Sequence, residues 1–180
     1  MHRCRPRRAP AAGGWTLLEV GIATAVLLIL LSVALPATQR LLDRQRAASA
    51  RHLLSSHLAF ARLAAIQRRV DISMCPSIDG VRCSGDAAGW GQGWIIRPTY
   101  ADTAIGDAVL RHQRLHYPRG WEIHSSSGRP HIRYLPDGRA WGTNLQLRIC
   151  SHGDLRGRVV VNNSGRIRSE TLDESGGCTP

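Results

Sequence analysis

A long apolar run near the start of the chain constrains its fold more than any other feature. Between Trp15 and Leu35 the sequence is apolar apart from small polar residues and one carboxylate, that of Glu19. A helix rises 1.5 Å per residue, so this run would extend for about 30 Å, the thickness of the hydrocarbon core of a bilayer. The sequence therefore predicts a membrane-spanning helix.

Two common explanations of such a run do not fit. A secretory signal peptide usually has an apolar region of ~7–15 residues followed by a small-residue cleavage site, whereas Gly13 and Gly14 precede this run. An ordinary anchor does not explain Glu19, because an ionisable group in a membrane helix costs about 2.5–3.5 kcal/mol on insertion scales. Residues 2–8 carry four arginines and no acid, which places that segment on the cytoplasmic side.

The chain is strongly basic, with a formal charge of +11, and all 24 of its Lys and Arg residues are Arg. A genome rich in G and C, which favours arginine codons, is sufficient to explain this bias. The charge still has a physical consequence, because a basic surface attracts polyanions such as nucleic acid or anionic lipid, and a guanidinium group binds phosphate through two donors at once.

Residues 37–69 contain no Gly and no Pro and predict a second helical segment. Pro36 separates this segment from the apolar run, and a proline inside a helix kinks the helix or ends it. The pattern favours an amphipathic helix with one face packed on a domain. The apolar positions that recur at helical spacing are Leu41, Ala48, Leu54, Leu58, Ala61 and Ala65.

After Arg69 the apolar pattern changes from a period of 3.6 to a period of 2, and short turns separate the segments. We therefore expect an α+β fold, in which the long N-terminal helix precedes an antiparallel β-sandwich head. The expected strands are Val70–Cys75, Trp94–Arg97, Val109–Leu115, Trp121–His124, His131–Leu135, Leu145–Cys150, Arg158–Asn162 and Gly165–Arg168.

Four of the five cysteines, Cys75, Cys83, Cys150 and Cys178, lie in the later chain. An even set suggests disulfides formed in an oxidising compartment, with three possible connectivities. Cys75 and Cys83 bracket a short loop, while Cys150 ends an expected strand and Cys178 lies in a glycine-rich tail. Of the three connectivities we predict Cys75–Cys83 with Cys150–Cys178.

Signals of an enzyme are absent from the sequence. It contains no G-x-S-x-G, no P-loop and no H-E-x-x-H motif. Four histidines lie in expected strands or turns, without a Cys or carboxylate at a metal-ligand spacing: His112, His116, His124 and His131. We expect no catalytic residue, no cofactor and no metal site.

The segment Gly14-Trp15-Thr16-Leu17-Leu18-Glu19 resembles the signal of class III type IV pilins. The resemblance implies cleavage between Gly14 and Trp15 by a prepilin peptidase at the cytoplasmic face, followed by N-methylation of Trp15. Phe is usual at that position, so Trp is a departure from the pattern. In a filament, the carboxylate of Glu19 would neutralise the amino terminus of a neighbouring subunit in an apolar core.

The order of motifs in the later chain resembles the GspH/FimT family of minor pilin-like subunits. The motifs are Cys75-Pro76-Ser77, Trp90-Gly91-Gln92-Gly93-Trp94, Tyr134-Leu135-Pro136-Asp137-Gly138-Arg139 and Gly165-Arg166-Ile167-Arg168. The implied organisation is a leader (1–14), a membrane or filament-core half of the helix (15–36), an amphipathic half (37–69) and a β head (70–180). The implied protein is a non-enzymatic, single-pass subunit of the bacterial inner membrane, with its head in the periplasm. Its partners would be the prepilin peptidase and other pilins or pseudopilins.

Two functions stay open at this point. Gly165-Arg166-Ile167-Arg168 resembles the G-R-x-R signature of DNA-binding FimT-like pilins, which act in natural transformation. Arg166 and Arg168 are two residues apart, so in an extended segment both point to one face. They would bind successive phosphates of double-stranded DNA, with Gly165 permitting close approach. The arginines that would widen this patch are Arg148, Arg156 and Arg158. In the alternative, this strand face is merely solvated and the chain is a tip subunit of a type II secretion pseudopilus.

Overall fold

The structure is a computed structural model that describes residues 16–100, 109–126, 128–142 and 144–178. The leader, the cleavage site after Gly14 and the methylated Trp15, all expected from the sequence, lie outside these residues. The chain divides into two compact units, Met1–Leu41 and Leu42–Pro180. We call them the N-terminal and the C-terminal unit and describe each by itself.

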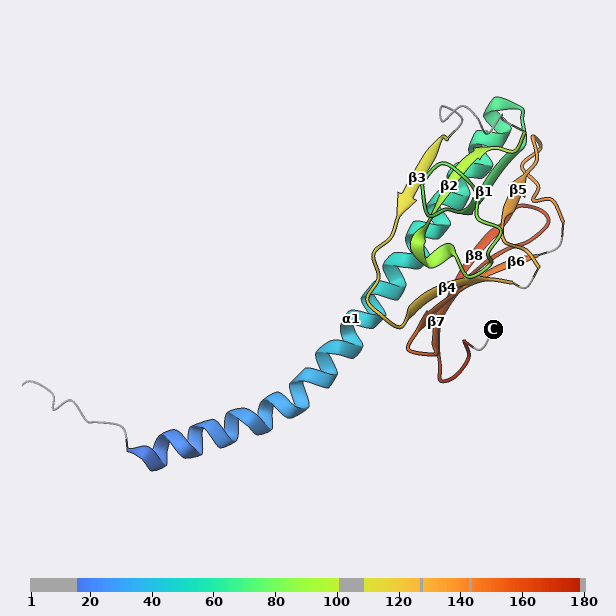
Figure 1. Ribbon diagram of the computed structural model, residues 1–180. Coiled ribbons are helices and arrows are strands. Elements are labelled where there is room, and N and C mark those ends of the chain that lie inside the picture. The colour runs from blue at the N-terminus through green and yellow to red at the C-terminus, as the bar shows by residue number, and fades with distance from the viewer. Residues whose placement is uncertain (1–15, 101–108, 127, 143, 179–180) are drawn as a thin grey trace, which may run out of the picture. The chain divides into compact units, whose positions relative to one another are not determined.

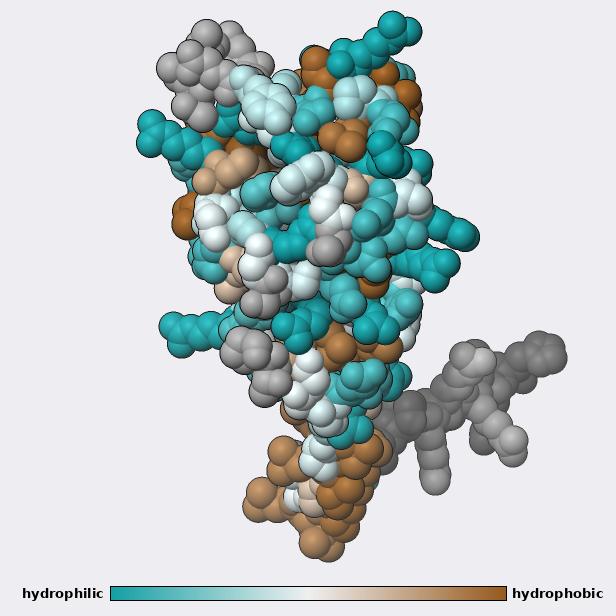
Figure 2. All heavy atoms as spheres, turned by 90° about the vertical axis from the view of Figure 1, so that its right-hand side faces the viewer, coloured by the Kyte–Doolittle hydropathy of each residue, from teal (hydrophilic) through white to brown (hydrophobic). Residues whose placement is uncertain are grey.

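In the N-terminal unit the apolar run is helical. Helix α1 (Leu17–Arg68) begins here, where the backbone N–H of Glu19 donates to the side-chain oxygen of Thr16 at 3.3 Å, a hydrogen bond typical of a helix N-cap. The apolar side chains of this part are exposed and form the brown surface in Figure 2. By length and composition, α1 can cross a membrane. It continues through Pro36 and does not end there.

In the C-terminal unit the second part of α1 is amphipathic, as predicted. Its buried face consists of residues three or four apart, so they share one side of the helix. That face comprises Ala47, Ala50, Leu54, His57, Leu58, Ala61, Ala64 and Ala65. Two residues that we expected on the same face do not belong to it: Ala48 is half-buried, and Leu41, the last residue of the N-terminal unit, is exposed.

Two four-stranded antiparallel sheets complete the C-terminal unit (Figure 1), which confirms the expected α+β fold. The first sheet has the order β3-β2-β1-β5 and the second the order β4-β6-β7-β8. Each expected strand is present, with shifted ends. The strands are β1 (Ile72–Pro76), β2 (Gly93–Pro98), β3 (Arg111–Arg114), β4 (Trp121–Ser125), β5 (Ile132–Tyr134), β6 (Leu145–Ser151), β7 (Asp154–Val161) and β8 (Ile167–Glu174).

The hydrophobic core joins α1 to both sheets. Trp90, in the 3₁₀ turn η1 (Trp90–Gln92), and Trp94 in β2 are fully buried. The indole N–H of Trp94 donates to Nδ1 of His57 on α1 at 2.8 Å. A buried N–H needs such a partner, because an unpaired buried donor costs about 1–3 kcal/mol. This bond therefore fixes the register of α1 against β2.

Both disulfides form with the connectivity predicted from the sequence. Cys75 of β1 is bonded to Cys83, and Cys150 of β6 is bonded to Cys178 in the tail after β8. The Cα atoms lie 5.5 Å apart in the first pair and 6.0 Å apart in the second. By the loop-closure model each bond contributes roughly 2–4 kcal/mol of stability. The second bond holds a tail that has no apolar core of its own.

Candidate functional site

The turn between β7 and β8 carries the G-R-x-R segment and is ordered by Asn162. The side-chain oxygen of Asn162 accepts hydrogen bonds from the backbone N–H of Arg166, at 2.9 Å, and from the hydroxyl of Ser164, at 2.8 Å. The N–H of Gly165 donates to the carbonyl of Asn162 at 2.8 Å. Asparagine favours such turns because its short side chain can replace a backbone acceptor.

Gly165 has a structural role that the sequence did not indicate. Its φ of +76° favours glycine, and a Cβ at this position would lie 2.1 Å from the carbonyl oxygen of Gly138. From α1, Nε of Arg62 donates to that same carbonyl at 2.9 Å, and its Nη2 donates to the carbonyl of Ser164 at 3.3 Å. The turn is thus packed against the loop after β5. The contribution of Gly165 to DNA contact stays a prediction.

Arg166 and Arg168 have exposed side chains, at the end of the turn and in β8 respectively. Within the described residues, neither guanidinium group has a hydrogen-bond or ion-pair partner. Each can therefore bind an external anion without breaking a contact of its own.

Arg148 and Arg158 lie on the second sheet, on the same face as Arg168. Arg158 is directly opposite Arg148 on β6 and Glu170 on β8, and Arg168 is two residues from Glu170. Residues paired across antiparallel strands share a face, and diagonal neighbours are about 7–8 Å apart. The fold therefore places Arg148, Arg158 and Arg168 on one face. Nε and Nη2 of Arg158 donate to the Glu170 carboxylate at 2.9 and 2.7 Å, which offsets the charge of Arg158.

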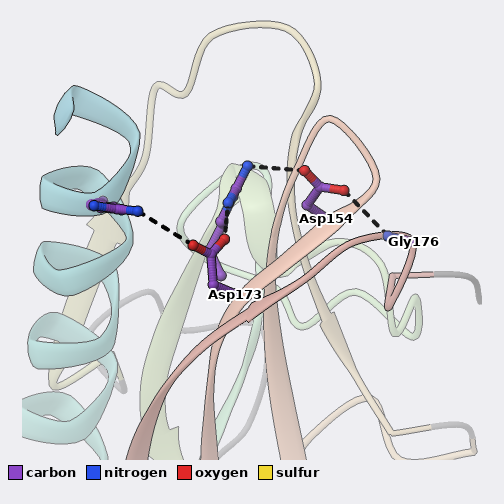
Figure 3. Close-up of polar contacts among 5 residues, drawn as sticks. Asp154, Asp173 and Gly176 are labelled. Carbon is purple, nitrogen blue, oxygen red and sulfur yellow. Dashed lines mark hydrogen bonds and ion pairs between the residues drawn. The ribbon is translucent and has the colours of Figure 1, made fainter. Parts of the chain in front are cut away.

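Arg156 has a different environment from the other arginines. It lies at an irregularity in the pairing of β7 and forms ion pairs with Asp154, at 2.9 Å, and with Asp173 (Figure 3). Asp173 also pairs with Arg44 of α1 at 3.5 Å, and Asp154 accepts a hydrogen bond from the N–H of Gly176 at 3.2 Å. Arg156 thus joins β7, β8 and the tail, and its charge is offset by two carboxylates.

Glu19, the residue expected to act in filament assembly, lies in the first turn of α1 with its side chain exposed. Among the described residues, no cation pairs with its carboxylate. The apolar side chains around it along α1 are also exposed. A carboxylate on an apolar helix gains most from a positive partner, because an opposite charge offsets its desolvation.

In the described part of the chain, no three His, Cys, Asp or Glu residues are grouped to hold a metal ion. Sequence reasoning missed a different feature, an exposed tryptophan, Trp141, beside the β7–β8 turn. Only the three-dimensional position of the loop after β5 shows that this residue neighbours Ser164. The sequence offers one indication of this feature, namely an aromatic residue close to a basic segment.

Comparison with solved structures finds the same fold in a minor pilin. The type IV minor pilin FimU of Pseudomonas aeruginosa strain PAO1 matches in two crystal forms, each 24% identical in sequence. One form gives a TM-score of 0.56 over 71% of this chain and 90% of FimU. The other gives 0.53 over 68% and 91%. The minor pseudopilin EpsH of the Vibrio cholerae type 2 secretion system is 16% identical, with a TM-score of 0.44 over 69% of this chain and 96% of EpsH.

A search of curated protein sequences finds no match to this chain. The family model described as type II transport protein GspH matches residues 50–165, from the second part of α1 to the β7–β8 turn. This match covers more than half of the chain and includes both sheets up to the start of the G-R-x-R segment. The chain therefore belongs to the GspH family and has its pilin-like fold.

Proposed function

We propose that this chain is a minor subunit of a type IV pilus that binds DNA through Arg166 and Arg168 during DNA uptake. One observation carries the proposal: Arg166 and Arg168 are exposed and lack partners among the described residues, and Arg168 shares a sheet face with Arg158 and Arg148. The family and the FimU fold support a filament subunit of this kind. In this role the chain forms part of the filament and binds DNA, and it catalyses no reaction.

The proposed route to the filament rests on α1 and Glu19. The precursor is cut after Gly14 and methylated at Trp15, and residues 15–36 hold it in the inner membrane with its β head in the periplasm. In the filament, the exposed apolar side chains of α1 pack on other pilin helices. Glu19 then pairs with the amino terminus of a neighbour, where the low dielectric strengthens their attraction.

Contacts to phosphate explain what such a site would recognise. Arg binds phosphate oxygens with paired donors, and phosphate contacts carry no base sequence information. Each contact to double-stranded DNA releases condensed counterions, so log affinity falls with log salt by about 0.9 per contact. Two contacts give weak binding that is independent of sequence, as uptake of arbitrary DNA requires.

The test compares matched pairs of substitutions in the full chain, embedded in nanodiscs of zwitterionic lipid. Arg166→Gln with Arg168→Gln should weaken binding of double-stranded DNA and reduce the salt slope by about two. The control is Arg114→Gln with Arg119→Gln, which removes the same charge from exposed positions in and after β3. Equal loss from both pairs would indicate diffuse attraction and contradict a local site.

A second function is favoured by the family description, which names a type II transport protein. In that case the chain is a minor pseudopilin at the tip of a type II secretion pseudopilus, and the arginine face is only solvated. The same experiment separates the two functions. If the wild-type chain does not bind DNA even at low salt, the secretion role is the better account.

A further inference from the structure

We propose that the hollow beside Trp141 holds an unpaired nucleobase of the DNA whose phosphates contact Arg166. This inference rests on the function proposed above and adds a preference for single-stranded DNA or frayed ends. It starts from the exposure of Trp141. The residue is 56% exposed, whereas Trp90, Trp94 and Trp121 are buried.

The position of the Trp141 ring is fixed by its neighbours. The backbone N–H of Trp141 donates to the carbonyl of Arg133 in β5 at 2.8 Å, and Nη2 of Arg129 donates to the carbonyl of Trp141 at 2.7 Å. The guanidinium carbon of Arg133 lies 4.2 Å from the centre of the ring. A cation on one face of an indole is attracted by its π electrons. The ring is therefore held in place while much of it stays accessible.

A hollow of about 470 Å³ adjoins this ring. Its lining combines apolar and polar groups. The loop after β5 contributes Leu135, Arg139, Ala140, Trp141 and Gly142, and the β7–β8 turn contributes Asn163 and Ser164. Its volume is within the range of about 300–1,000 Å³ that is usual for small-ligand sites. An aromatic wall with a few polar groups suits a flat, amphipathic ring such as a nucleobase.

The hollow and the arginine site share the β7–β8 turn. The N–H of Ala140 donates to the backbone carbonyl of Asn163 at 3.0 Å, which joins the two loops. Ser164 lines the hollow, and Arg166 is two residues further along the chain. A base stacked on Trp141 would leave its phosphate near Arg166, and the side-chain amide of Asn163 can donate to and accept from a base edge. Stacking is tolerant of sequence because every base has a π face.

The experiment isolates stacking from charge. We would measure the affinity of the full chain, in zwitterionic nanodiscs, for a short oligothymidylate and for an abasic oligomer of the same length. The two carry the same phosphates, but only the first can stack. The wild type should prefer oligothymidylate by roughly 5- to 150-fold, the range for one stacked base. Trp141→Ala should lose this preference and keep its affinity for the abasic oligomer, while Trp141→Phe should keep part of it.

The matched control is Tyr100→Ala. Tyr100 is 79% exposed, and its hydroxyl accepts from Nη1 of Arg133 at 3.0 Å, yet it does not line the hollow. Its removal should leave the preference for bases intact.

Three results would overturn the inference while leaving the proposed function in place: equal affinity of the wild type for both oligomers, equal loss for both in Trp141→Ala, or a loss of preference in Tyr100→Ala as large as in Trp141→Ala. Failure of the wild type to bind either oligomer at low salt would overturn the inference, and the proposed function falls with it only if the wild type also fails to bind double-stranded DNA.

Discussion

Replacing Gly165 by alanine tests whether this glycine is required by packing within the fold. Gly165 has a φ of +76°, and an added Cβ would lie 2.1 Å from the carbonyl oxygen of Gly138. The left-handed conformation costs an alanine roughly 1–2 kcal/mol. The overlap requires a backbone shift, which typically costs about 1–3 kcal/mol more. We therefore expect Gly165→Ala to lower the free energy of unfolding by about 2–5 kcal/mol.

The matched control is Gly153→Ala in the β6–β7 turn. Gly153 has a φ of +84°, but nothing lies within 4 Å of an added Cβ. This variant should therefore show the conformational cost alone, about 1–2 kcal/mol.

Thermal unfolding of the full chain, followed by near-ultraviolet circular dichroism of the buried tryptophans, measures the difference. A unit of this size shifts its melting temperature by roughly 3–4 °C per kcal/mol. Gly165→Ala should thus melt about 6–20 °C below the wild type and Gly153→Ala about 3–8 °C below it. Equal shifts of the melting temperature in the two variants would refute the packing argument. Contact with DNA would then be the one role left for Gly165.

Three further predictions concern processing, assembly and pH. Gly14→Val should leave the leader attached, because a peptidase site that fits glycine excludes a side chain; mass spectrometry should find Trp15 at the amino terminus of the wild type only. Glu19→Ala should be cleaved and inserted normally but should be depleted from sheared filaments, because the neighbouring amino terminus loses its counter-charge; normal incorporation would contradict this. Burial, with a further effect of Arg111, lowers the pKa of His57. As pH falls, this histidine is therefore protonated in the unfolded chain before it is protonated in the folded chain. The free energy of unfolding should then fall as pH drops below about 6.5, by at most about 1.4 kcal/mol per pH unit. His57→Gln should reduce this dependence in melts between about pH 7 and pH 5, and an unchanged slope would show that other histidines cause it.

The order of elements could be predicted from the sequence because each has a local cause. The absence of Gly and Pro from residues 37–69 favours helix, and the period-2 segments favour strands. The extent of β8 could not be predicted in this way. The strand continues to Glu174, well past Arg168. Its later residues are mostly polar, and ion pairs across the sheet stabilise them, as between Arg158 and Glu170. Periodicity detects burial, and this edge strand buries little.

In the candidate site, too, local features could be predicted from the sequence and contacts between distant residues could not. Two arginines spaced two residues apart are visible in the sequence, and so are cysteines at the ends of a short loop. The partners of Arg156 depend on the pairing of β7 with β8, which brings Asp173 from a distant position. The role of Gly165 depends on Gly138, which lies on another loop. Contacts between remote segments follow from packing, and one sequence read alone does not contain them.

The net charge of the chain does not show where DNA would bind, but the positions of the carboxylates reduce the number of arginines that could bind it. Several carboxylates are placed against particular guanidinium groups, such as Glu170 against Arg158 and Asp137 against Arg139. At physiological salt, fields decay over about 8 Å, so a paired arginine attracts little beyond its own partner. Positive potential is left where arginines lack such partners, as at Arg166 and Arg168. Arg114 and Arg119 also lack ion-pair partners among the described residues, but Arg114 lies in β3 of the other sheet and Arg119 in the turn before β4. If the absence of an ion-pair partner were sufficient for DNA binding, substitution of Arg114 and Arg119 would weaken binding as much as substitution of Arg166 and Arg168. A larger loss at Arg166 and Arg168 requires in addition the face shared with Arg148 and the neighbouring Trp141.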